Sequence, residues 1–160
     1  MTTKLQLQKG FSAAINEAKK GIRQKHGGPF GAAIIKNEKI IALGHNTVLK
    51  NNDPTAHAEI NAIRAATKKL KSPHLKNCIL IATSEPCPMC LTTSYWAKIK
   101  AIYYALPKSV ADDAGFQDNF IYKDLAKPIK KRKLKLICFP SSIKDSKMIF
   151  TDWKKTGKLY

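Results

Sequence analysis

Apolar residues near the start of the chain recur every three or four positions, which is the spacing of an amphipathic helix. Over residues 5–22 the recurring positions are Leu7, Phe11, Ala14, Ile15, Ala18 and Ile22. Two short apolar runs follow, at 30–36 and 39–44, separated by the polar pair Asn37-Glu38. Such a short polar break typically joins the strands of an antiparallel hairpin. The pattern therefore predicts a helix followed by a β-hairpin.

The middle of the chain alternates between helical and extended patterns. Asp53-Pro54-Thr55 interrupts the chain and offers capping side chains to the segment that follows. The predicted elements are a helix at 56–70, a strand at 78–83, a helix at 88–99 that begins with Pro88, and a strand at 101–106. Because strands that alternate with helices build a sheet with helices packed on it, this pattern predicts an α/β fold.

The pattern is weaker toward the end of the chain. Residues 134–139 are apolar enough for a fifth strand, and residues 145–155 have the spacing of a final helix. Cys138 falls in the first of these segments and Cys78 in the strand at 78–83. We expect both to be buried core thiols.

Length and composition indicate one domain. The 160 residues, 44% of them hydrophobic, are enough for one core and too few for two ordinary domains, so we predict a single domain spanning 1–160. The N-terminus has no apolar signal region, and no apolar run is long enough to cross a bilayer, which predicts a cytoplasmic protein without membrane association. In a reducing compartment, the four cysteines favour metal ligation or burial over disulfides.

The formal net charge of +18 could attract nucleic acid, an anionic membrane or acidic partners. The charge is almost all lysine, scattered along the chain, with a dense run only at Lys127–Lys135. Scattered lysines are typical of a solvated surface, and few arginines are present for base recognition. Nucleic acid is therefore a possible partner that is not favoured.

Two motifs carry candidate chemistry, His57-Ala58-Glu59 and Cys87-Pro88-Met89-Cys90, each at a predicted helix start. Cysteines three apart on a first turn point the same way, and His57 completes three ligands suited to Zn²⁺. Three protein ligands leave a position for water, as in catalytic zinc sites. Glu59 leaves the turn in a different direction from His57, so it is the candidate proton shuttle.

Each motif alone is a weak signal, since Cys-x-x-Cys also forms redox pairs. Together they match the signature of zinc deaminases. The sequence resembles the cytidine deaminase superfamily, in the branch of bacterial guanine deaminases and tRNA adenosine deaminases, which share Asn52–Glu59. The guanine deaminases are more similar, since the resemblance extends to Gly27–Ala32, Glu85–Leu91, Tyr95–Ala97, Ala114–Phe116 and Phe120–Lys123.

This resemblance implies a three-layer α/β/α fold with a five-stranded mixed sheet. It implies hydrolysis of guanine to xanthine and ammonia, with Glu59 moving the protons. It also implies substrate-binding residues, namely Phe30, Asn46, Ala58, Asp118 and Tyr160. Asn46 would read the purine edge, Asp118 would accept hydrogen bonds from guanine, and Phe30 would pack on the base. Family members exchange C-terminal segments, so the resemblance predicts a homodimer in which residues 140–160 are exchanged and Tyr160 closes a pocket.

Three alternatives remain open at this point. A tRNA adenosine deaminase would share the metal site and could use the positive charge to hold phosphates. A cytosine or other base deaminase is a further enzyme hypothesis. From another class, a zinc-stabilised nucleic-acid-binding protein could keep the fold without turnover, although the presence of Glu59 argues against it.

Overall fold

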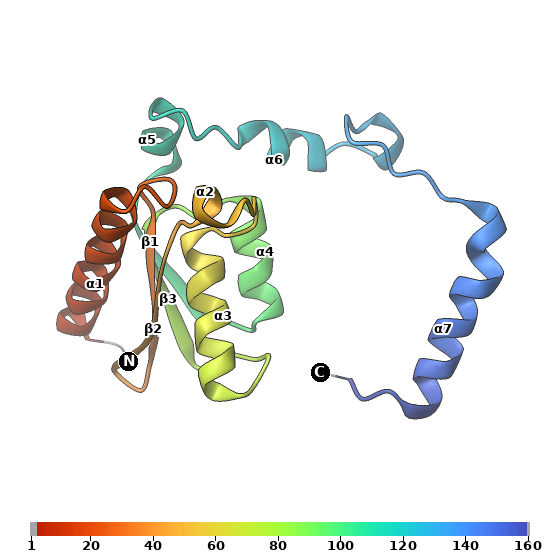
Figure 1. Cartoon of the computed structure of the whole chain (residues 1–160), viewed down its shortest axis with the longest axis horizontal. Coiled ribbons are helices and arrows are strands. Elements are labelled where there is room, and N and C mark those ends of the chain that lie inside the picture. The colour runs from red at the N-terminus through yellow and green to blue at the C-terminus, as the bar shows by residue number, and fades with distance from the viewer. Residues whose placement is uncertain (1–2, 160) are drawn as a thin grey trace. The chain divides into compact units, whose positions relative to one another are not determined.

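The computed structural model describes residues 3–159, and within this range it contains seven α-helices and four β-strands (Figure 1). The chain divides into two compact units, the first ending at Asp118 and the second beginning at Asn119. The elements of the first unit are α1 (Lys4–Arg23), β1 (Gly31–Lys36), β2 (Lys39–His45), α2 (Val48–Asn51), α3 (Ala58–Leu70), β3 (Cys78–Ser84), α4 (Pro88–Trp96), β4 (Ala101–Leu106) and α5 (Lys108–Asp113).

The sheet has the strand order β2-β1-β3-β4. β1 is antiparallel to both β2 and β3, whereas β3 and β4 are parallel, so the predicted mixed sheet is confirmed. The predicted hairpin is also present. Its turn residues Asn37 and Glu38 have φ angles of 46° and 67°, the positive values that tight hairpin turns require.

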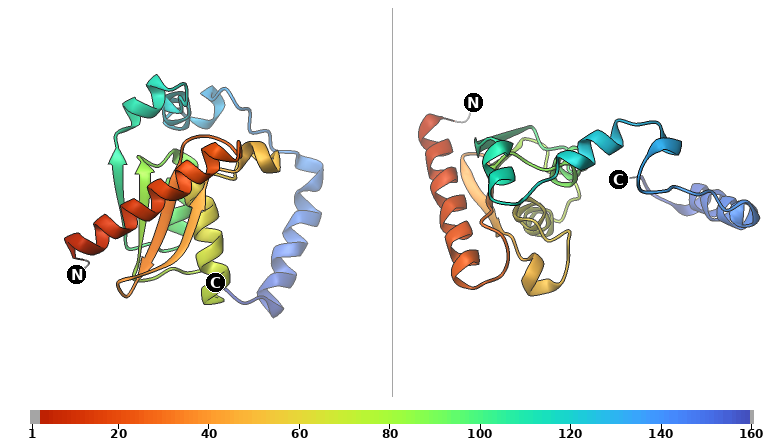
Figure 2. Two further views of the ribbon diagram at one scale, coloured as in Figure 1. Left: turned by 60° about the vertical axis from the view of Figure 1, so that its left-hand side comes forward. Right: turned by 90° about the horizontal axis from the view of Figure 1, so that it is seen from above.

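Helices cover both faces of this sheet, and the alternation of side chains along β1 explains why. Ala33 and Ile35 pack in a cluster with Ala14 of α1, while Ala32 and Ile34 pack on the opposite face with residues of α3. Figure 2 shows α1 on one side of the sheet and α3 on the other. The predicted α/β class, with helices on both faces of the sheet, is therefore confirmed.

The prediction of a fifth strand at 134–139 is wrong, because within residues 3–159 the sheet has four strands. Leu134, Ile137 and Phe139 are 77%, 85% and 71% exposed, and Cys138 is also exposed, contrary to the prediction that it is buried. An apolar run becomes a strand only when a neighbouring strand accepts and donates its backbone hydrogen bonds, and the local pattern does not show whether such a partner exists. Cys78, in contrast, is fully buried as predicted.

The second unit is built from short elements and one longer helix. They are α6 (Asn119–Leu125), 3₁₀ turns at Ile129–Lys131 and Pro140–Ser142, and α7 (Ile143–Thr156), which contains the predicted helix at 145–155. These elements hold no buried residue. Within residues 3–159 no helix is both long and apolar enough to cross a membrane.

Candidate active site

Two helix starts bring the candidate metal ligands together. His57 is the N-cap of α3, and Cys87 is the N-cap of α4, followed by Pro88 in the first turn. Neither capping side chain hydrogen-bonds to the backbone of its own helix. Both side chains are therefore available to interact across the gap between the helices, and Cys90 joins them from the first turn of α4.

The three side chains have a geometry that fits zinc. The His57 Nδ1 atom lies 3.5 Å from the Cys87 Sγ atom and 3.6 Å from the Cys90 Sγ atom. All three candidate ligand atoms lie within 4.8 Å of one another. Bond lengths of about 2.3 Å to sulfur and 2.0 Å to nitrogen place two ligands of a tetrahedral zinc site about 3.5 Å apart. The residues could thus hold a metal ion with little rearrangement.

The two thiols differ strongly in acidity because they share a hydrogen bond. The Cys90 thiol stabilises the ionised Cys87, so the pKa of Cys87 is lowered to about 4 against the opposing effect of burial, with a further contribution from His57. The same hydrogen bond, together with burial, raises the pKa of Cys90. The hydrogen bond to Cys87 also raises the pKa of His57. One sulfur of the group is therefore a thiolate, the form that binds zinc.

Glu59 lies in the first turn of α3, where only 7% of its surface is exposed. Burial raises the pKa of its carboxyl, and the nearby Cys87 thiolate adds to this effect. Its side chain hydrogen-bonds to Cys90, so it lies at the edge of the ligand group. A buried carboxyl with a raised pKa is suited to accept and return a proton.

The predicted substrate residues Asn46 and Phe30 are joined by a backbone hydrogen bond. Asn46 follows β2 and is 5% exposed, and its backbone N–H donates to the Phe30 carbonyl at 3.1 Å. Its side-chain oxygen accepts hydrogen bonds from the N–H groups of Gly28 and Val48, at 3.2 Å and 3.1 Å. These two bonds fix the orientation of the amide. Phe30 is half-buried and packs against the core beneath α3.

The other predicted substrate residues have different surroundings. Ala58 is fully buried in the core cluster. Asp118 forms an ion pair with Lys108, and its charge acts on His57, contributing to the raised pKa of the imidazole. Tyr160 lies outside the described residues. The structure thus brings His57, Cys87, Cys90 and Glu59 into one group.

Comparisons with known proteins identify the family. The family described as "Cytidine and deoxycytidylate deaminase zinc-binding region" matches residues 4–106. The chain belongs to this family. It is 50% identical over 121 residues to the guanine deaminase of Bacillus subtilis, covering 76% of this chain and 78% of that protein. The predicted resemblance to guanine deaminases is confirmed.

A solved structure of the Bacillus subtilis guanine deaminase matches with a TM-score of 0.88 and 41% identity, covering 96% of each chain. The tRNA-specific adenosine deaminase of Aquifex aeolicus is 43% identical over 99 residues, which cover 61% of this chain and 65% of that protein. The chain is therefore a homologue of guanine deaminase with a zinc-binding deaminase region, and it also retains similarity to deaminases that act on tRNA.

Two contacts of the predicted substrate residue Phe30 and its neighbour Gly31 are not indicated by the sequence pattern. The Phe116 ring meets the Phe30 ring edge to face, with centroids 4.9 Å apart and planes at 84°. The Thr83 hydroxyl accepts a hydrogen bond from the Gly31 N–H at 3.0 Å, at the start of β1. Phe116 lies within Ala114–Phe116, one of the segments that resemble guanine deaminases. No local pattern indicates which aromatic ring it contacts.

Three hydroxyl residues follow the ligand turn in α4. Thr92, Thr93 and Ser94 each donate a hydrogen bond to a carbonyl three or four residues earlier in the helix, with distances of 2.8–3.1 Å. Their polar groups are thus satisfied within α4 itself. These bonds explain how α4 accommodates three successive hydroxyl side chains.

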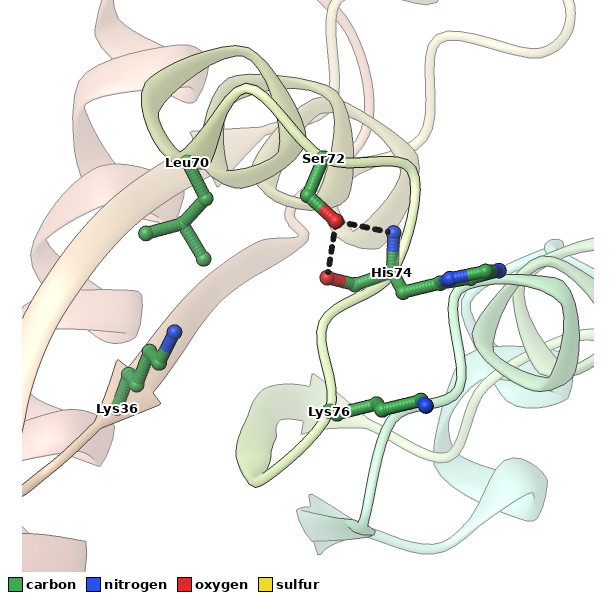
Figure 3. A pocket seen from close by; sticks show the side chains of 5 residues that line it. All are labelled: Lys36, Leu70, Ser72, His74 and Lys76. Atoms are coloured by element: carbon green, nitrogen blue, oxygen red, sulfur yellow. Dashed lines mark hydrogen bonds between the residues drawn. The ribbon is translucent and has the colours of Figure 1, made fainter. Parts of the chain in front are cut away.

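A separate hollow lies at the other end of α3 (Figure 3). It is lined by Lys36, Leu70, Ser72, His74 and Lys76. Ser72 Oγ donates to the His74 carbonyl and accepts from the His74 N–H, each at 3.1 Å. Because α3 runs from Ala58 to Leu70, this hollow is about 20 Å along the helix from the metal ligands. Its side chains offer neither carboxylate nor thiolate, so it is not part of the deaminase site.

Proposed function

We propose that this protein catalyses the hydrolytic deamination of guanine to xanthine and ammonia. The observation that supports it most directly is the group formed by His57, Cys87 and Cys90 with the buried carboxyl of Glu59 beside it. This group combines three zinc ligands with a proton carrier, which is the combination that hydrolytic deaminases use.

In this proposal His57, Cys87 and Cys90 hold a zinc ion and Glu59 moves protons. Bound zinc supplies the Lewis acidity that lets water act as a nucleophile near neutral pH. Glu59 accepts the proton that water loses on attack at the ring carbon bearing the amine and delivers it to a ring nitrogen. Glu59 then transfers the second proton to the departing amine, so that one water is consumed for each ammonia released.

Substrate recognition is proposed for the residues around this group. The Asn46 amide oxygen is engaged by the Gly28 and Val48 N–H groups, so its NH₂ group is the part suited to donate to a purine acceptor. Asp118 is suited to accept from the N–H groups of guanine, which adenine lacks. The rings of Phe30 and Phe116 would pack on the base, and Ala58 would contact it.

We further propose a homodimer in which residues 140–160 are exchanged, with Tyr160 closing the pocket of the partner. Apolar side chains of α7 support this proposal, since Ile149 and Phe150 are both 70% exposed. On α4, Tyr95 and Trp96 are 76% and 78% exposed. Surfaces of this kind on soluble proteins commonly mark interfaces. A cytoplasmic location and a role in purine metabolism complete the proposal.

A second candidate function is deamination of adenosine in tRNA. The net charge of +18 favours it, because phosphate contacts depend on positive charge. Asp118 favours guanine instead, since a carboxylate has no donor partner at the corresponding edge of adenine.

The experiment is to measure ammonia release by the zinc-loaded protein from guanine, cytosine, adenine and tRNA in parallel. Turnover of guanine is expected in the wild type, with a loss of at least about 100-fold in Glu59→Gln, because general acid–base catalysis typically contributes that much. Glu38→Gln, at the exposed hairpin turn, is the matched control and should keep full activity. Release from tRNA alone would replace the proposed substrate. Salt-sensitive RNA binding without any turnover would favour a binding protein.

A further inference from the structure

Three polar side chains, called here the Glu17–His45–His26 series, lie next to Asn46, the residue that follows β2. The Oε2 atom of Glu17, on α1, lies 2.8 Å from His45 Nδ1, so the carboxylate accepts a hydrogen bond from the His45 ring. The other ring nitrogen of His45, Nε2, lies 2.9 Å from His26 Nδ1. Both nitrogens of the His45 ring are thus engaged, at a residue with only 11% of its side chain exposed.

The packing around His45 leaves its ring little room to move. Its ring stacks on that of His26, with centroids 5.2 Å apart and planes at 21°. A Cβ atom added to Gly21, one turn after Glu17 on α1, would lie 2.8 Å from His45 Cδ2. The absence of a side chain at Gly21 therefore makes the space in which His45 reaches Glu17.

The Glu17–His45–His26 series connects directly to the segment that holds Asn46. His45 is the residue before Asn46, and the His26 carbonyl accepts hydrogen bonds from the N–H groups of Leu49 and Lys50, both at 3.0 Å. The Asn46 side-chain oxygen meanwhile accepts from Gly28, two residues after His26. The segments 26–30 and 45–50 are therefore held together on both sides of Asn46.

We propose that Glu17, His45 and His26 are positioning residues that hold Asn46 for the purine base and release it when the two histidines take up a second proton. The proposal rests on the proposed function in assigning the base to Asn46. It adds an acid-sensitive element to substrate binding that is separate from the metal group.

The proton count explains the acid sensitivity. The bond between His26 Nδ1 and His45 Nε2 needs one proton between two nitrogens. It forms when both rings are neutral, with His26 donating, and also when the pair carries one extra proton, with His45 donating. When both rings are charged, the two facing nitrogens both carry protons, so the bond is lost and the charges repel.

The charged groups around the pair are Glu17 and Lys20 on α1 and Lys50 on α2. Desolvation and the positive charges of Lys50, His45 and Lys20 lower the pKa of His26, so the second proton binds only in acid. Burial opposes ionisation of Glu17, but hydrogen bonds from His45 and Lys20 lower its pKa overall. These hydrogen bonds favour the carboxylate form of Glu17, which is the form that accepts from His45.

The test is the pH dependence of KM and kcat for guanine in wild type and His26→Phe, which keeps a ring on His45 but lacks the nitrogen. The wild-type KM should rise as the pH falls, because Asn46 is released. Effects on the metal group should appear in kcat instead. His26→Phe should have a KM about five- to tenfold higher at neutral pH, the effect of losing one hydrogen bond, and should lack the additional acid rise. His74→Phe, at the far end of α3, should match the wild type. A wild-type KM and pH profile in His26→Phe would overturn the proposal.

A second measurement does not depend on guanine turnover. The chain has four histidines, so imidazole nitrogen resonances of zinc-loaded protein can be assigned by comparing wild type, His26→Phe and His74→Phe. A His26 titration that shifts in Glu17→Gln, an effect passed through the His45 ring, would support the Glu17–His45–His26 series. A His26 titration that is unchanged in Glu17→Gln would overturn it. Absence of guanine turnover in the wild type would instead refute the proposed function. These spectra would then decide by themselves whether the Glu17–His45–His26 series exists.

Discussion

The backbone of α1 approaches the sheet closely at Gly31, the first residue of β1. A Cβ atom placed there would run into the carbonyl oxygen of Ala14 and lie 2.9 Å from both the Ala14 carbonyl carbon and the Ala18 nitrogen. These are backbone atoms of a helix, so no side-chain rotation can relieve the contact. In Gly31→Ala, therefore, α1 would have to move away from the sheet along much of its length.

The expected cost follows from this geometry. Overpacking a core typically costs 1–3 kcal/mol, and a clash with rigid helix backbone belongs near the upper end, at about 3 kcal/mol. For a folded unit of this size each kcal/mol lowers the melting temperature by roughly 3–5 °C, so Gly31→Ala should melt about 10 °C below the wild type. The displacement of α1 would also move Glu17, which contacts His45.

Thermal unfolding of zinc-saturated protein, followed by circular dichroism, measures this cost. The matched control is Gly115→Ala, where φ is +92° and no atom lies within 4 Å of the added Cβ. The control has only the backbone strain of a left-handed residue, about 1–2 kcal/mol. If Gly31→Ala melts at or above the temperature of Gly115→Ala, the inferred contact between α1 and β1 is wrong.

Three further outcomes are expected. Asp118→Asn should lower kcat/KM for guanine by about 10- to 100-fold, the value of a charged hydrogen bond, whereas exposed Asp145→Asn should not; equal activity in both variants would remove Asp118 from the site. Chelation of zinc should abolish turnover, and adding zinc back should restore it. For zinc at about 1,000 times its dissociation constant, chelation should also lower the free energy of unfolding by about 4 kcal/mol. An unchanged urea midpoint would contradict this. Glu17 has a pKa below its ordinary 4.5, so its favourable contribution is present above that pH and is lost as the pH falls through the lower folded value. As the pH falls below 4.5, Glu17→Gln should therefore lose less stability than the wild type in urea titrations, and parallel losses would argue against the ion pair.

Much of the first unit could be predicted from local pattern. The expected helix at 5–22 and the strands at 39–44, 78–83 and 101–106 agree with α1, β2, β3 and β4 to within one or two residues. The pattern is strongest where an element is buried, as in β3, whose seven residues are all buried, and α1, which buries one face. The helix expected at 88–99 ends earlier, at Trp96, because Lys98 adopts a positive φ of 55°. Lysine has no marked preference for that conformation, so composition does not indicate this end.

The candidate ligands were predictable for a related reason. The spacing of Cys87 and Cys90 places both on one helical turn whatever the rest of the fold does, and His57 is marked by its position before a helical pattern. Short-range spacing therefore determines most of the metal group. What spacing does not determine is that α3 and α4 begin side by side, with His57 Nδ1 3.5 Å from Cys87 Sγ.

The amino-acid sequence by itself determined the α/β class, the helix and strand order of the first unit, and the identity of the zinc motifs, because these depend on residues close together in the chain. Only the tertiary structure decided which distant side chains meet, as in the pairs Glu17–His45, His45–His26 and Phe30–Phe116. It also decided that residues 134–139 form no strand, since strand formation requires hydrogen-bonding partners from elsewhere in the fold. Contacts of this kind depend on how helices and strands pack, which no local repeat in the sequence records.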